Sequence, residues 1–353
     1  MGRRGFNDAW RLQYLSDLST LPDYDEGYYS SHHGRWGERV GPPVDEEGNP
    51  VYHHVPENWK AAKSDGERWR WLLARAEALN PELKTHVSYT LAAFWHQQFG
   101  VQTLAAYGGR YRPGRPLEDG QDESSPYEVH TLTDGETIAR LAVGVHRFQL
   151  PDEFNYIRRF EKIMNSSDNG YAGPAVRALA QIYENRRQYD RALAYWEIYK
   201  KHDPSFARQH TDQIAANWGV FETATPQPAG YNPTVEYRFR NGRYVDFTAH
   251  RIRVDRLLED VKAYVRSRPR RLNGQKVNLN NIGWRLVHEN QTRYIGERVA
   301  AWQLDLDPDP RHWDRRVAVK LPGTLKPAGA HLLGIVDADL IIDPDADTAE
   351  EIL

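Results

Sequence analysis

Two pairs of adjacent histidines, His32-His33 and His53-His54, are the first residues of this chain whose type and spacing suggest chemistry. Four imidazoles on one loop could bind a metal ion, because histidine is a frequent ligand of zinc and copper. A metal site also needs ligands at a regular spacing, oriented by a second set of side chains. The sequence has no such spacing and no His-Glu-x-x-His motif. We therefore interpret these residues as solvated loop histidines, and a hydrolase built on them is our weakest hypothesis.

Three alternating acids, Asp305, Asp307 and Asp309, form a second candidate. Alternating carboxylates can bind calcium, but a calcium-binding loop also needs a central glycine and a distal glutamate. Both are missing, and Pro308 and Pro310 restrict the backbone at this point. The pattern is more typical of a solvated turn that follows a strand.

Four arginines form a basic run, at Arg266, Arg268, Arg270 and Arg271. A nucleic-acid site would need interleaved aromatic residues or a wider basic face. Cations are favoured at the C-terminal ends of helices, so we predict that this run is a solvated helix end. The whole chain has 46 basic and 49 acidic residues and a net charge of −3, which also argues against nucleic-acid binding.

Other signatures of catalysis are missing from the sequence. It has no phosphate-binding loop, no dinucleotide-binding glycine fingerprint and no Gly-x-Ser-x-Gly motif. It also has no cysteine, which excludes disulfides, thiolate metal sites and cysteine nucleophiles. The glycosylation sequons at Asn165 and Asn290 are of a kind that is common by chance. We therefore expect a protein that is not an enzyme and has no catalytic, cofactor-binding or metal-binding residue. No apolar run approaches the roughly 20 residues of a transmembrane helix.

The first half of the chain has the apolar spacing of helices. Residues 1–150 are predicted to form a helical array with long polar loops at 23–56 and 108–126. The helices are expected at 7–18, at 67–79, from Pro81 onward and at 136–148, and the next one at 153–164.

Residues 151–222 are predicted to form tetratricopeptide-like helical hairpins. The order of large, small and aromatic residues that indicates this repeat is found in Val176, Leu179, Ala180, Tyr183, Ala192, Trp196 and Pro204. Ala180 and Ala192 would let two antiparallel helices approach closely, while Tyr183 and Trp196 fill the space between hairpins. Asn185-Arg186-Arg187 would form the turn, and Pro204 would end the second helix. Tyr199 departs from the pattern, because the repeat usually has a small residue there.

Prolines and glycines at 223–233 predict a linker. Residues 234–353 then alternate between apolar and polar, which predicts an antiparallel β-sandwich with one helix at 255–265. Asn241-Gly242 is a strong hairpin signal between a strand at 235–239 and its return at 245–247. Further strands are expected at 300–306, 317–321 and 333–335. The predicted fold class is α+β multidomain, a helical array followed by the sandwich.

Several segments resemble, in chain order, the region upstream of and including the first macroglobulin domain in bacterial, planctomycete-type alpha-2-macroglobulin family proteins. These segments are residues 7–24, Phe99–Thr103, Leu150–Asn155, Gln181–Tyr189, Thr234–Gly242, Leu257–Tyr264, Trp302–Leu306 and Trp313–Val317. They belong to a structural region, so no functional residue can be carried over from the family. The tail at 340–353 fits the family pattern poorly.

The resemblance implies a protease trap. In this family a bait segment is cleaved, the molecule closes around the protease, and a thioester between a Cys and a Gln captures it covalently. A chain without cysteine cannot form that bond. We therefore expect a non-catalytic segment of an endopeptidase inhibitor, whose partners are proteins such as proteases or an envelope protein. The alternative is a free-standing scaffold that binds a protein through its helical array.

The cellular compartment and the length of the gene product are also only expectations, drawn from the family resemblance and from the N-terminal sequence. The family implies export or a cell-envelope location. No signal peptide is visible, and a chain that was complete as given would be cytoplasmic. A helix that begins as close to Met1 as residue 7 suggests a piece of a longer protein.

Overall fold

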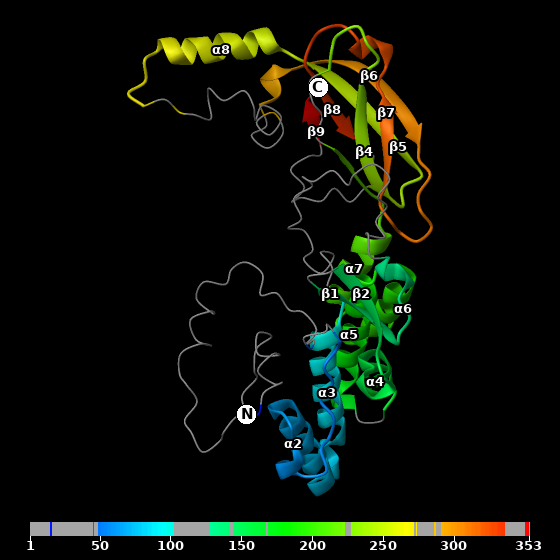
Figure 1. Ribbon diagram of the computed structural model, residues 1–353. Helices are drawn as coiled ribbons and strands as arrows, with labels where there is room; N and C mark the ends of the chain where they lie inside the picture. The colour runs from blue at the N-terminus through cyan, green and yellow to red at the C-terminus, as the bar shows by residue number, and fades with distance from the viewer. Residues whose placement is uncertain are drawn as a thin grey trace. The chain divides into compact units, whose positions relative to one another are not determined.

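The computed structural model describes residues 15, 45, 49–101, 128–141, 144–166, 169–222, 227–271, 273, 286, 291–335 and 350–352 (Figure 1). Their helices and antiparallel sheets make an α+β protein. The described residues form two compact units. We call the one that ends at Arg208 the helical unit and the one that begins at Gln209 the sandwich unit. Apart from Leu15, the helix expected at 7–18 lies outside the described residues, as does the loop expected at 108–126.

Three predicted helices of the helical unit are confirmed. They are α2 (Asp65–Leu79), α3 (Lys84–Phe99), which follows a short turn at Pro81–Leu83, and α4 (Tyr156–Met164). Side-chain caps set two of their starts. The hydroxyl of Ser64 accepts a hydrogen bond from the Glu67 N–H at 3.2 Å, and the Asn155 side chain accepts one from the Arg158 N–H at 3.1 Å. Such caps satisfy N–H groups that have no partner within the helix.

The helix predicted at 136–148 is wrong. The segment forms an antiparallel hairpin of β1 (Glu136–Leu141) and β2 (Gly144–Gln149), in which Glu136 lies opposite Gln149. Thr137 is fully buried, and its hydroxyl donates to the carbonyl oxygen of Phe99. The Glu136 carbonyl accepts from Arg186, which lies 50 residues further along the chain. Hydrogen bonds to such distant residues stabilise the extended conformation of this segment. The spacing of apolar residues in the sequence does not indicate these contacts.

A helix pair follows where the helical hairpin was predicted. α5 (Ala172–Asn185) and α6 (Tyr189–Tyr199) are joined by three residues, of which Arg187 adopts a positive φ of 55°. Ala180 and Ala192 are both fully buried, as the close approach of two helices requires. The role predicted for Pro204 is wrong, because α6 ends at Tyr199 and Pro204 is the first residue of α7 (Pro204–Ala215). A tetratricopeptide-type array remains a prediction.

The sandwich unit contains two antiparallel sheets. One has the order β3-β4-β7 and the other β6-β5-β8-β9. The strands are β3 (Trp218–Phe221), β4 (Thr234–Arg240), β5 (Tyr244–Ile252), β6 (Ile295–Asp305), β7 (Arg315–Lys320), β8 (His331–Ile335) and β9 (Glu350–Ile352). Side chains of both sheets share one core, which includes Tyr237, Phe239, Val319, Val245, Phe247 and Leu333. The strands expected around 235–239, 245–247, 300–306, 317–321 and 333–335 are therefore confirmed, while β3 and β9 were not predicted.

The hairpin predicted at Asn241-Gly242 is wrong, because β4 and β5 belong to different sheets. Asn241 has a φ of 60°, and its side-chain amide donates to the carbonyls of Ile214 and Ala216 at 2.8 and 2.9 Å. Its amide oxygen lies 2.8 Å from Nδ1 of His312. These contacts turn the chain from one sheet to the other. Both strands face the same core with alternate residues, so their periodicity looks the same as that of a hairpin.

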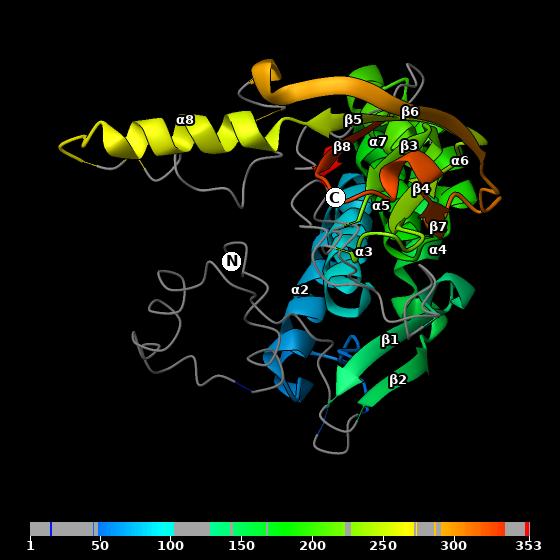
Figure 2. The same ribbon diagram turned by 90° about the horizontal axis from the view of Figure 1, so that it is seen from above.

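The helix expected at 255–265 is confirmed as α8 (Val254–Arg266), which leads away from the strands of its unit (Figure 2). Leu257 is buried in a small cluster with Ile252 and Tyr294. Arg266 is the last residue of α8, and the other three arginines of the basic run follow it and are exposed. The run is therefore a solvated helix end, as predicted.

We expect Asn241→Gly to lower the free energy of unfolding by about 1–2 kcal/mol, because it removes two half-buried hydrogen-bond donor contacts and one acceptor contact. In an ordinary two-residue hairpin turn glycine would replace this asparagine at little cost, since it adopts positive φ freely. Urea unfolding of the variant and the unaltered chain measures the difference. Equal stability of the two would mean that the side-chain contacts of Asn241 do not hold this turn.

Candidate functional site

The histidine pair at 53–54 divides into a buried and an exposed residue. His53 is buried, its Nδ1 lies 3.4 Å from the Ser64 hydroxyl, and its ring fills the space beside Gly66. Burial lowers the pKa of His53 to about 4, so the imidazole is neutral at pH 7. The prediction of a solvated loop histidine is therefore wrong for His53. It is confirmed for His54, which is exposed and lies 3.3 Å from a carboxylate oxygen of Glu153.

The other residues considered as metal ligands do not come together in the described part of the chain. His32 and His33 lie outside the described residues. Asp307 pairs with Arg315 and Asp309 with Arg311, after the end of β6, so the interpretation as a turn is confirmed for these two acids, whereas Asp305 is the last residue of β6. Among the described residues, no three side chains of His, Asp or Glu are grouped as metal ligands would be.

A buried arginine joins the β1–β2 hairpin to the helix pair. The Arg186 side chain has 0% relative exposure. Its guanidinium donates to the carbonyls of Thr133 and Glu136 at 2.7 and 2.8 Å and to the Tyr156 hydroxyl at 2.9 Å. A buried charge is tolerated when hydrogen bonds replace its lost hydration. Arg186 thus fixes where the chain before β1 lies against α4 and α5.

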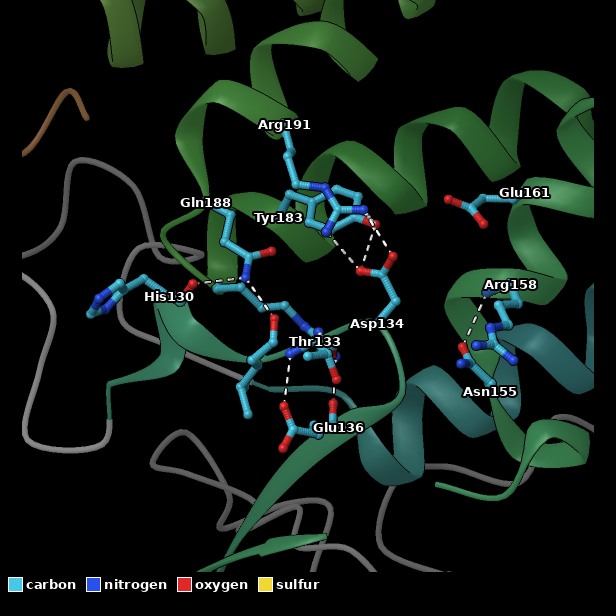
Figure 3. A network of polar contacts seen from close by, with 12 residues as sticks. His130, Thr133, Asp134, Glu136, Asn155, Arg158, Glu161, Tyr183, Gln188 and Arg191 are labelled. Atoms are coloured by element: carbon cyan, nitrogen blue, oxygen red, sulfur yellow. Dashed lines mark hydrogen bonds and ion pairs between the residues drawn. The ribbon is translucent and has the colours of Figure 1, made fainter. Parts of the chain in front are cut away.

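A second cluster of polar side chains surrounds Asp134 (Figure 3). Arg191 donates to the two carboxylate oxygens of Asp134 at 2.7 and 2.9 Å, and the Tyr183 hydroxyl donates to the same carboxylate at 3.1 Å. Burial alone would raise the pKa of Asp134, but the hydrogen bonds from Arg191 and Tyr183 lower it below its usual value. Burial raises the pKa of Tyr183. A phenol that stays protonated and a carboxylate that stays ionised have no proton to exchange near pH 7, so we interpret this group as structural.

The helical unit also contains a half-open cavity of about 430 Å³, lined by residues of α3, α4, α5 and the end of α6. Aromatic rings line it, together with one guanidinium, that of Arg177. The half-buried His96 faces it from α3. Burial lowers the pKa of His96 to about 4, and the charge of Arg186 lowers it further. At pH 7 this imidazole is therefore a neutral hydrogen-bonding group and not a cation.

Sequence reasoning missed this cavity. It predicted that Tyr183 and Trp196 fill the space between packed helices. Both have 0% relative exposure, so they are core residues. The lining residues Arg177 and His202 lie at no recognisable motif spacing, and no sequence signal distinguishes them from surface residues of a helix.

Comparisons with known proteins give a limited result. No family model matches the chain, and no curated protein matches it. A crystal structure of native alpha-2-macroglobulin from Escherichia coli, spanning domains MG0-NIE-MG1, is similar at 13% identity over 39% of this chain and 38% of that one, with a TM-score of 0.25. A second one, spanning domains NIE-MG1, is similar at 14% identity over 39% of this chain and 59% of that one, also with a TM-score of 0.25. The match thus spans less than two thirds of either fragment.

Among the described residues, no helix is both long and apolar enough to cross a bilayer.

Replacing Arg186 by methionine is expected to lower the free energy of unfolding by about 1–3 kcal/mol for each of the two buried carbonyls that lose their donor. Arg186→Lys should recover only part of the loss, since one ammonium group cannot reach partners that the guanidinium contacts from two nitrogens. Urea unfolding gives both values. A methionine variant as stable as the unaltered chain would contradict the assigned role.

The buried His53 makes stability depend on pH. Its pKa falls from 6.5 to about 4 on folding, so the unfolded chain binds a proton below pH 6.5 that the folded chain does not. Stability is therefore lost as the pH falls from 6.5 to 4, by at most about 3 kcal/mol for one such group.

Urea unfolding at a series of pH values, on the unaltered chain and on His53→Gln, isolates this contribution. The variant should lose less stability than the unaltered chain over that window. If the free energy of unfolding depends on pH equally in the variant and the unaltered chain, His53 is protonated as readily in the folded chain as in the unfolded one.

Proposed function

We propose that this chain is a non-catalytic segment of an alpha-2-macroglobulin-like endopeptidase inhibitor, with a scaffold or interaction role. The observation that supports the proposal is the two-sheet antiparallel sandwich. It contains Thr234–Gly242, Trp302–Leu306 and Trp313–Val317, which are the segments whose resemblance implies a macroglobulin domain. Sequence pattern and architecture thus agree on this part of the chain.

The proposal assigns the capture of a protease to the whole inhibitor. Covalent capture needs a thioester, and a chain without cysteine cannot supply one. The contribution of this segment would be to carry or position the parts that act. Its partners would be proteins, namely the captured protease or a protein of the cell envelope, and its location would be exported or envelope-associated.

A precipitation experiment with an antibody against this chain tests the proposal. The native gene product is taken from its own cells after exposure to an active protease, or to the same protease with a blocked active site. We expect only the active protease to be retained, because cleavage triggers capture. The purified 353-residue chain should retain neither form.

Two outcomes would contradict this proposal. One is cleavage-dependent retention of protease by the purified chain alone. The other is a native product that retains the blocked protease as well as the active one, or retains neither.

A second candidate is a protein-binding scaffold, and the cavity of the helical unit is the observation that favours it. The contact residues would then be those that line the cavity, not the buried Tyr183 and Trp196. The same precipitation, without added protease, separates the two candidates. A single stoichiometric cellular partner would favour the scaffold, while its absence together with retention of active protease would favour the inhibitor.

A further inference from the structure

The cavity of the helical unit has the size and charge of a site for a small organic anion. Its volume of about 430 Å³ lies in the range of small-molecule sites. Arg177 is the permanent cation among its lining residues, which include no aspartate or glutamate. Ala93, Gly173 and Ala178 also line it, and their small side chains leave space between the helices.

Arg177 differs from several other arginines of the helical unit in its surroundings. Arg70, Arg158 and Arg191 each pair with a carboxylate. Within the described part of the chain, Arg177 has no carboxylate partner, and its Cζ lies 4.3 Å from the centre of the Phe206 ring. Stacking on a ring restrains the plane of a guanidinium and leaves its N–H edge available. That edge can donate two parallel hydrogen bonds to one carboxylate.

Flat rings form two walls of the cavity. Tyr89 of α3 and Phe160 of α4 lie with ring centres 5.9 Å apart, and Tyr199 and His202 at the end of α6 lie 5.7 Å apart. The His202 ring packs against the first turn of α5, since a Cβ on Gly173 would be 3.0 Å from its Nδ1. Walls of this kind bind flat or apolar groups by stacking and by burial of their surface.

We propose that this cavity binds an organic carboxylate attached to a flat or apolar group. Arg177 holds the carboxylate, and the rings of Tyr89 and Tyr199 contact the rest of the ligand. A free aromatic acid and the C-terminal residue of a peptide share this chemistry. The inference depends on neither the inhibitor role nor the scaffold role.

Calorimetric titration of the full chain with N-acetyl-phenylalanine and with its amide tests the proposal without any variant. The two probes have the same ring, but only the first has a carboxylate. We expect the acid to bind at least about tenfold more tightly than the amide, because charge-assisted bidentate hydrogen bonds are among the stronger ones. An acetylated tripeptide that ends in phenylalanine distinguishes the two sources. Tighter binding than the single residue points to a peptide end, and weaker binding points to a small acid.

Arg177→Gln tests the residue that holds the carboxylate. The substitution should weaken binding of the acid by about tenfold or more and leave binding of the amide unchanged. Arg158→Gln is the matched control, because Arg158 is an exposed arginine on α4 that does not line the cavity. Far-ultraviolet circular dichroism confirms that each variant is folded. The proposal is overturned if millimolar acid does not bind to the unaltered chain, if the amide binds equally well, or if Arg177→Gln binds the acid as the unaltered chain does.

Discussion

The helical unit depends on the burial of one positive charge. The guanidinium of Arg186 is removed from water and donates hydrogen bonds to two backbone carbonyls and a phenol. Desolvating a cation is costly, so the chain must bring these acceptors to it. The carbonyls come from residues about 50 positions earlier, at Thr133 and Glu136. The β1–β2 hairpin therefore lies against the helices because Arg186, in the turn after α5, needs these carbonyls as acceptors. The positive charge of Arg186 also helps to keep Asp134 ionised.

Elements that depend on local contacts could be predicted from the sequence. Helices α2 and α4 begin at a serine and an asparagine that cap them, and the apolar spacing of α8 is regular. The helix expected at 136–148 failed because its true conformation depends on Arg186 and on the carbonyl of Phe99. The hairpin expected at Asn241 failed for a similar reason, since carbonyls near the end of α7 hold that side chain.

The candidate site was less accessible to sequence reasoning than the fold. A histidine looks the same in a sequence whether it is solvated, as His54 is, or buried beside a glycine, as His53 is. Tyr183 and Trp196 were expected to fill space between packed helices, and they are core residues. Arg177 has no distinguishing neighbour in the sequence, and its importance follows from the rings and the space around it. The carboxylate site and the inhibitor role are separate inferences, because one rests on the helical unit and the other on the sandwich.

We propose that the chain acts as part of a larger inhibitor. The most direct measurement is the mass and location of the native gene product, determined in its own cells by fractionation and an antibody against this chain. We expect a product much larger than 353 residues in the envelope or exported fraction. A cytoplasmic product with the mass of the 353-residue chain would contradict the claim and favour an independent scaffold.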